Sequence, residues 1–266
     1  MQQVVIVTGA SSGFGKAIAE RLATAGHRVY GLCRREVEHP TVSYLTCDVR
    51  SPQAVQAAVE TVMQREGRVD VLVNNAGMGI GGALELATPE EIDLQMGTNF
   101  MGCVNMCQAV LPYMRSQGRG RIVNISSIGG VMGLPYQGFY SASKFAVEGF
   151  SEALAAEVRG FGISVSLVEP GDFATGFTAS RRNSQGTMTH EAYAESFKRS
   201  LGLIEQEENG GGKPEQVACV VERIVRSRHP RMRYVVSNLE QWLSVAIKRV
   251  LPGRWFVGIL RSYYKV

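Results

Sequence analysis

Three residues in the middle of the chain have the types and spacing that suit acid–base chemistry on a carbonyl or an alcohol. Tyr140 and Lys144 are four positions apart, so in a helix they share one face, and Ser127 precedes the tyrosine by thirteen positions. A phenol normally loses its proton near pH 10, and a neighbouring ammonium favours the phenolate. Such a pair can exchange a proton with a substrate near neutral pH, while the serine hydroxyl holds the same substrate oxygen.

The N-terminus contains an element that can hold a phosphate. An apolar run over 3–8 predicts a strand, TGASSGFG follows over 8–15, and an amphipathic helix begins at 14. A glycine turn between strand and helix lets a phosphate approach the backbone at the helix N-terminus. The glycine spacing differs from the common G-x-G-x-x-G, and a tight turn without a ligand is the plain alternative.

The rest of the chain alternates between strand and helix patterns. We predict strands at 3–8, 28–33, 42–46, 70–74, 121–125, 163–168 and 232–236. We predict helices at 14–25, 52–66, 89–96, 99–117, 139–160, 190–201, 214–227 and 239–250. This alternation indicates an α/β fold, a single-domain doubly wound parallel sheet that is Rossmann-like with helices on both faces, over residues 1–266.

Six motifs occur in the order and spacing of a known family. They are TGASSGFG (8–15), NNAG (74–77), Asn99 in TNFMG, Ser127 in VNISSIGG, YSASK (140–144) and PGDFAT (170–175). Over about residues 1–177 the chain resembles the short-chain dehydrogenases/reductases. Within that family, LPYQGFYSASKFAVEGFSEAL and VSLVEPGDFATGF are most similar to the 17β-hydroxysteroid dehydrogenase and retinol dehydrogenase branch.

The resemblance implies a catalytic set of Asn99, Ser127, Tyr140 and Lys144. The resemblance also implies that Asn99 holds a water molecule, which connects to Lys144 in a proton relay. The alternatives are that Asn99 caps the helix that follows it, and that the tyrosine and serine only pack or cap. Ser126 competes with Ser127, and the spacing to Tyr140 selects Ser127.

The resemblance also implies a nicotinamide dinucleotide. The strand at 28–33 ends without an acid and continues into Arg34 and Arg35, whose guanidinium groups suit a 2′-phosphate. We therefore expect NADP(H) to be favoured over NAD(H), although Glu36 is near and both arginines could belong to a solvated turn. The expected cofactor residues are Gly9, Ser11, Ser12, Gly13, Phe14, Gly15, Arg34, Asp48, Val49, Asn75, Ala76, Gly77, Tyr140, Lys144, Pro170, Gly171, Phe173 and Thr175.

The expected substrate pocket is mostly apolar, which favours a lipophilic ketone, aldehyde or alcohol. In this family the pocket walls follow the NNAG, Ser127 and PG motifs. Here those segments offer Met78, Met132, Leu134, Tyr136 and Phe177, with Leu84, Phe139 and Phe173 as further candidates, and core packing is the alternative for each. A polar start and a glycine-rich end suggest a mobile lid over 178–212.

The predicted function is an NADP(H)-dependent oxidoreductase for such a substrate, with Tyr140 as acid and base. A reductase of 3-oxoacyl thioesters would share the site residues, and a dinucleotide-binding sensor or scaffold would share the fold. No signal peptide is visible and no apolar run reaches the about 18 residues that span a bilayer, so we expect a cytoplasmic protein. The five scattered cysteines indicate packing rather than a metal site.

The C-terminal segment 237–266 is basic and aromatic. From residue 213 onward there are 11 Lys and Arg and 3 Asp and Glu. Such a segment can lie on a membrane surface, but because Pro252 and Gly253 interrupt it, packing on the pocket or at a subunit interface is favoured. We expect no nucleic acid partner. By family resemblance we expect a homodimer or homotetramer formed through 99–117 and 139–160.

Overall fold

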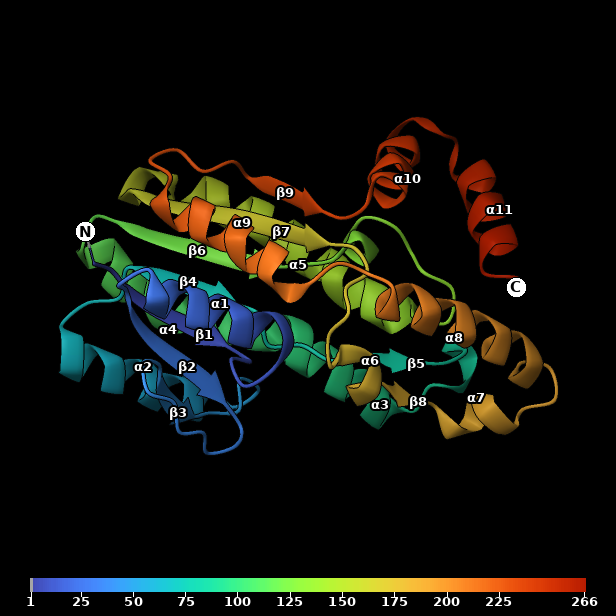
Figure 1. Ribbon diagram of the computed structural model, residues 1–266, viewed down its shortest axis with the longest axis horizontal. Coiled ribbons are helices and arrows are strands. Elements are labelled where there is room, and N and C mark those ends of the chain that lie inside the picture. Colours follow the sequence, from blue (N-terminus) through green and yellow to red (C-terminus); the bar gives the residue numbers. More distant parts are fainter. Residues whose placement is uncertain (1) are drawn as a thin grey trace.

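The computed structural model describes residues 2–266, apart from the side chains of Phe177 and Ala179. Seven strands form one parallel sheet in the order β3-β2-β1-β4-β6-β7-β9, which confirms the predicted fold (Figure 1). The strands are β1 (Val4–Thr8), β2 (Arg28–Cys33), β3 (Ser43–Thr46), β4 (Val71–Asn74), β6 (Gly120–Ile125), β7 (Ile163–Pro170) and β9 (Arg233–Val236).

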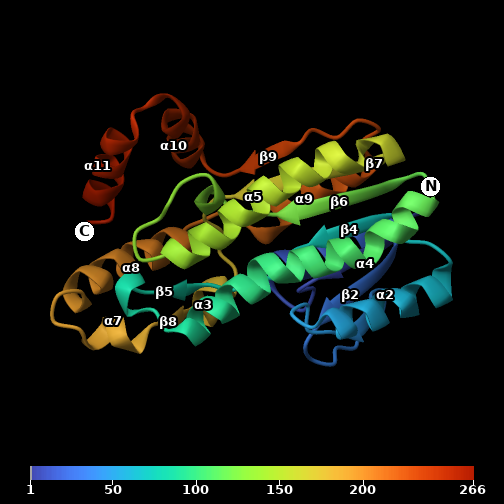
Figure 2. The ribbon, with the colours of Figure 1, turned by 180° about the vertical axis from the view of Figure 1, so that it is seen from behind.

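Helices cover both faces of this sheet. Figure 1 shows α1 (Gly13–Thr24) and α9 (Pro214–Arg226) on one face, and Figure 2 shows α2 (Pro52–Glu66), α4 (Gly102–Ser116) and α5 (Gly138–Val158) on the other. Successive side chains of β1 alternate between the two cores, because neighbouring residues of a strand point to opposite faces. A strand buried on both faces is continuously apolar, which explains the run VVIVT.

The segment after β7 contains more structure than the sequence predicts. It holds α6 (Phe177–Ser180), β8 (Arg182–Asn183), α7 (Gln185–Thr189) and α8 (Ala194–Asn209), and β8 pairs with the short strand β5 (Ile80–Gly81). The helix predicted over 190–201 corresponds to α8, which begins later and continues to Asn209. Glu208 is buried against Arg181, a contact between residues distant in the sequence.

Two helices follow β9 where the sequence predicts one. The predicted helix is α10 (Leu239–Val250), and α11 (Gly253–Tyr263) follows it directly. Pro252 separates them, but a proline at a helix N-terminus costs no hydrogen bond, so it also begins the second helix. Both helices lie beyond the end of β9 (Figures 1 and 2).

Candidate active site

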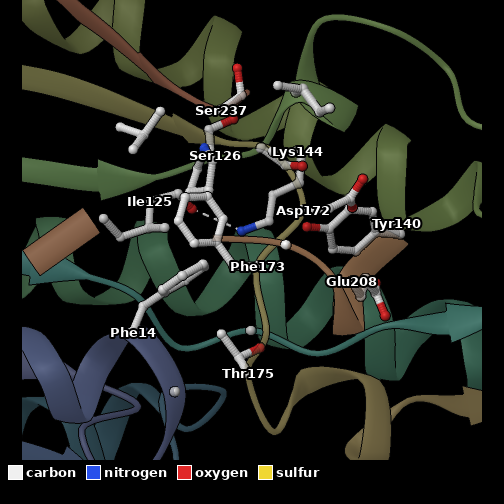
Figure 3. Close-up of a pocket in the computed structure, with 18 of the residues that line it drawn as sticks. Phe14, Ile125, Ser126, Tyr140, Lys144, Asp172, Phe173, Thr175, Glu208 and Ser237 are labelled. Atoms are coloured by element: carbon white, nitrogen blue, oxygen red, sulfur yellow. Dashed lines mark hydrogen bonds between the residues drawn. The ribbon is translucent and has the colours of Figure 1, made fainter. Parts of the chain in front are cut away.

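A cavity of about 1360 Å³ lies at the carboxyl ends of the central strands. Its lining comes from the segments that follow β1, β2, β4, β6 and β7, and from α5, α8, α10 and α11. In a parallel α/β sheet this edge is where ligands bind, beside the point at which the strand order reverses. Figure 3 shows Tyr140, Lys144, Asp172 and Glu208 around the cavity, with Phe14, Phe173 and Thr175 nearby.

The glycine turn after β1 fits a dinucleotide. Gly9 and Gly13 have φ of +65° and +51°, a conformation that glycine adopts without strain. A Cβ on Gly9 would lie 2.9 Å from the Cα of Ala76, so the backbones of the two loops are in close contact. Ser12 precedes α1 without a side-chain cap, which leaves the backbone N–H groups of that helix end for an anion.

The predicted cofactor residues line this cavity with one exception. Gly9, Ser11, Ser12, Gly13, Phe14, Arg34, Asp48, Val49, Asn75, Ala76, Gly77, Tyr140, Lys144, Pro170, Gly171, Phe173 and Thr175 all contribute to it. Gly15 lies beneath the turn instead, where an added Cβ would meet the Gly9 carbonyl oxygen at 2.3 Å. Gly15 therefore supports the turn rather than facing the cavity.

The two arginines after β2 have different environments. Arg34 is exposed and lines the cavity, whereas the guanidinium of Arg35 donates to the carbonyl oxygen of Ser11 at 2.9 Å. Asp48 is held by the guanidinium of Arg50, at 2.6 Å between Nη2 and Oδ2, and this ion pair lowers the pKa of the carboxyl group. Glu36 is exposed and lies outside the cavity lining.

Asn99 and Lys144 are fixed by short hydrogen bonds deep in the site. Asn99 lies in a π-helical turn, Gly97–Met101, between α3 (Pro89–Met96) and α4, so its interpretation as a helix cap was wrong. Its side chain accepts from the backbone N–H of Met78 at 2.8 Å and donates to Ser143 at 3.0 Å. The ammonium of Lys144 donates to the carbonyl oxygen of Ile125 at 2.8 Å, and burial lowers its pKa to about 8.

Tyr140 and Ser127 lie together at the cavity wall. A side-chain hydrogen bond joins them, and the Lys144 ammonium is 6.0 Å from the centre of the tyrosine ring. Burial raises the pKa of Tyr140 to about 12, and the bond with Ser127 only partly opposes this shift. The expectation of a phenol that titrates near neutral pH is therefore not met by the protein groups alone. The protein holds Tyr140 as a neutral acid.

The predicted pocket residues divide into two groups. Met78, Met132 and Leu134 line the cavity. Tyr136 lies outside the lining, because its ring packs 5.2 Å from that of Phe197 and its hydroxyl bonds to Ser196. Leu84 and Phe139 are also outside the lining, and the side chain of Phe177 is outside the described part of the chain.

Two walls of the cavity consist of residues that the sequence did not single out, although packing of the C-terminal segment on the pocket was among its expectations. One is acidic, and comprises Asp172, Glu207 and Glu208; burial, followed by the two glutamates, raises the pKa of Asp172 to about 7. The other is apolar, and comprises Leu203 and Ile204 of α8 with Phe256, Ile259, Leu260, Tyr263 and Tyr264 of the C-terminal segment. The spacing of Phe256, Leu260 and Tyr264 at four-residue steps was the available signal for a buried helix face.

A family model described as short chain dehydrogenase matches residues 3–186. This chain belongs to the short-chain dehydrogenase/reductase family. It is 55% identical to 3-ketodihydrosphingosine reductase of Bacteroides thetaiotaomicron, over 99% of this chain and 98% of that protein. It is also 36% identical to human 17-beta-hydroxysteroid dehydrogenase type 1, over 88% of this chain and 77% of that protein. These comparisons confirm the predicted family and the predicted similarity to hydroxysteroid dehydrogenases.

Solved structures agree with this family assignment. A short-chain dehydrogenase from Streptomyces avermitilis superposes with a TM-score of 0.81 at 33% identity, covering 98% of this chain and 93% of that one. A short-chain dehydrogenase/reductase from Burkholderia phymatum, solved in complex with NAD, gives 0.80 at 25% identity, covering 92% of each chain. This protein is accordingly an NAD(P)-dependent oxidoreductase that acts on carbonyl or alcohol groups. Within its described residues, no helix is both long and apolar enough to cross a membrane.

Proposed function

We propose that this protein is an NADP(H)-dependent reductase of a lipophilic ketone, with Tyr140 as the proton donor. The observation that carries the proposal is that one cavity contains Ser127, Tyr140 and Lys144 together with the glycine turn and a long apolar wall. A neutral phenol, a serine hydroxyl and an apolar surface are what the reduction of a hydrophobic carbonyl requires.

Each side chain has a distinct part in this mechanism. Ser127 and Tyr140 hydrogen-bond the substrate carbonyl oxygen, which stabilises the negative charge that develops there. Tyr140 gives its proton to that oxygen, and the ammonium of Lys144 stabilises the resulting phenolate. The bound cofactor supplies the hydride. Asn99 positions the Met78 backbone and Ser143 through its amide, and its part in a water relay stays a prediction.

The preference for NADP(H) rests on Arg34. This exposed guanidinium lines the cavity at the end of β2, the position from which the family reaches the adenosine ribose. We expect Arg34→Ala to weaken NADPH binding by roughly 10- to 100-fold, the effect of losing a charged hydrogen bond, while NADH binding changes little. Arg35→Ala is the matched control, because it removes support for the Ser11 backbone and should affect both cofactors alike. Equal losses for both cofactors in Arg34→Ala would refute the assignment.

The substrate we propose is a long-chain ketone. The relative with 55% identity is named for 3-ketodihydrosphingosine, a long-chain ketone that carries an amino group beside the carbonyl. The cavity offers both an apolar wall, from α8 and α11, and the carboxylates of Asp172 and Glu207. Because α8 belongs to 178–212 and forms part of this wall, its position supports the role proposed for that segment as a lid over the substrate.

Cofactor consumption by the purified protein tests the proposal. The panel is 3-ketodihydrosphingosine, steroid ketones, retinal, short aliphatic ketones and 3-oxoacyl thioesters, each with NADPH and with NADH. We expect turnover of the long-chain ketone with NADPH preferred. Turnover of thioesters alone would establish the acyl reductase instead, and NADPH binding without any turnover would favour the sensor.

A further inference from the structure

The outward face of α10 is apolar and exposed. Successive members of the set Leu239, Trp242, Leu243 and Val250 are three, one and seven positions apart, so they lie on one side of the helix. Their exposed fractions are 72%, 51%, 43% and 80%. None of the four lines the cavity. A helix of a soluble protein normally packs its apolar face against the protein core, whereas this apolar face of α10 points to solvent.

The inward face of α10 holds the helix to the rest of the protein without these residues. The amide of Gln241 bonds to the carboxylate of Asp172, and Val245 is buried beside Phe256 of α11. The same cluster includes Ile128 and Met132 at the cavity. The packing predicted from the sequence is therefore present on this side. It accounts for the inner face and leaves the outer face without a structural partner in the described residues.

The exposed apolar face is accompanied by positive charge. Residues 237–266 contain five Lys and Arg and one Glu. Arg249 follows Trp242 by two helical turns and is exposed, and the guanidinium of Arg254 lies 5.7 Å from the ring of exposed Trp255. Aromatic and aliphatic side chains beside basic ones are the composition of helices that lie in the interface of a bilayer.

We propose that the outer face of α10, with the flanking basic residues of α10 and α11, docks on an anionic phospholipid surface. The apolar side chains enter the headgroup boundary and the basic side chains pair with the lipid phosphates. A second copy seated on the same face would bring like charges together across the contact, whereas an anionic bilayer neutralises them.

Docking in this way places the cavity next to the lipid. Phe256, Leu260 and Tyr264 line the cavity and belong to the same C-terminal segment that carries the membrane face. A long-chain ketone can then pass from the bilayer to the site along apolar surface. This consequence rests on the proposed function, but the docking itself does not, because it depends only on the surface of α10 and α11.

Flotation with lipid vesicles tests the docking without any measurement of turnover. The full chain is mixed with vesicles of phosphatidylcholine alone, or of phosphatidylglycerol and phosphatidylcholine together. We expect binding to the mixed vesicles, weaker binding as salt rises, and little binding to phosphatidylcholine alone. Leu243→Glu should reduce binding at least about tenfold, because one buried leucine contributes that much to transfer from water. Arg249→Gln should reduce it by roughly fivefold, on mixed vesicles only.

Two controls separate the membrane face from general effects. Met188→Glu changes an exposed apolar residue of α7 and should leave vesicle binding intact. The thermal unfolding midpoint of Leu243→Glu without lipid should match that of the wild type, which shows that the variant is folded. Absence of binding to mixed vesicles, or equal binding by wild type and Leu243→Glu, would overturn the proposal. So would a change of oligomeric state in Leu243→Glu without lipid, which would show that a second copy covers this face.

Discussion

Burial has opposite consequences for the two ionisable groups at the centre of the site. It disfavours the charged form of each, so the pKa of Tyr140 rises to about 12 and that of Lys144 falls to about 8. At neutral pH the tyrosine is therefore neutral and the lysine is mostly an ammonium. This combination of a proton donor beside a cation suits Tyr140 to give a proton to a substrate oxygen that gains negative charge.

The first prediction concerns the phenolic proton. Tyr140→Phe keeps the ring but removes the only group that we assign as proton donor, so turnover should fall by roughly 100- to 10,000-fold. The affinity for NADPH, measured by fluorescence titration, should be nearly unchanged, because the glycine turn and Arg34 remain. A variant that keeps most of its turnover would show that Tyr140 is not the acid.

The second prediction concerns the pH dependence of reduction. The ammonium of Lys144 stabilises the Tyr140 phenolate, and the pKa of Lys144 is about 8. The rate of reduction should therefore be at its maximum below about pH 8 and fall as the pH rises through that value. Glu148 raises the pKa of Lys144, so Glu148→Gln should move this falling limb to lower pH. The measurement is kcat against pH in both proteins.

Glu152→Gln is the matched control for Glu148→Gln. Both glutamates pair with Arg233, at 2.7 and 2.8 Å, so either change removes one partner of that arginine. Glu152 is exposed, and of these two glutamates Glu148 alone raises the pKa of Lys144, which burial lowers and Cys103 also raises. An equal shift of the limb in the two variants would mean that Arg233, rather than the charge of Glu148, controls the profile.

At the scale of elements, the strand–turn–helix unit at the N-terminus depends on two backbones in contact. Gly15→Ala would place a Cβ 2.3 Å from the Gly9 carbonyl oxygen, so the turn must shift. We expect a loss of stability of about 1–3 kcal/mol and weaker binding of NADPH, measured by thermal unfolding with and without the cofactor. Gly202→Ala in α8 is the control, because nothing lies within 4 Å of its added Cβ and alanine favours a helix interior by roughly 0.5–1 kcal/mol. Comparable losses in both variants would contradict the role of Gly15.

The sequence predicts those elements whose signal is local. Strands such as Val4–Thr8 are buried on both faces and therefore continuously apolar, and Thr88 and Pro89 mark the start of α3 at the predicted residue. Four of the six motifs follow strand ends, so they meet at one edge of the sheet. The structure brings all but Gly15 of the predicted cofactor residues to the cavity.

The features that the sequence did not predict depend on contacts between distant segments. Glu208 is buried within α8 because it pairs with Arg181. Tyr136 lies outside the cavity lining because its ring packs against that of Phe197 in α8. The helix after Pro252 forms a cavity wall through Phe256; the spacing of its apolar residues indicates a buried face, but the element against which that face packs depends on distant segments. The raised pKa of Tyr140 likewise follows from burial, whereas the spacing to Lys144 predicts the opposite direction.

At the scale of the whole molecule, two of the surfaces that expose large apolar side chains lie on different elements. One is the outer face of α10. The other includes exposed Phe145 of α5 and exposed Met101, which directly precedes α4. Figure 2 shows α4 and α5 on the same side of the sheet. The family is typically oligomeric, and we propose that α4 and α5 form the subunit contact of a homodimer or homotetramer. The two surfaces then have different occupants, a second copy on one and lipid on the other.

Phe145→Glu tests this division. Burial of one phenylalanine contributes about 1.5–3 kcal/mol, and a symmetric contact buries it in each copy, so a carboxylate there should shift the protein to a smaller species. Light scattering after size exclusion measures the mass, with Met188→Glu as the control for an exposed apolar residue elsewhere. Leu243→Glu on the α10 face should leave the mass unchanged. A monomeric wild type, or a Phe145→Glu variant of the same mass as an oligomeric wild type, would show that α5 is not the contact.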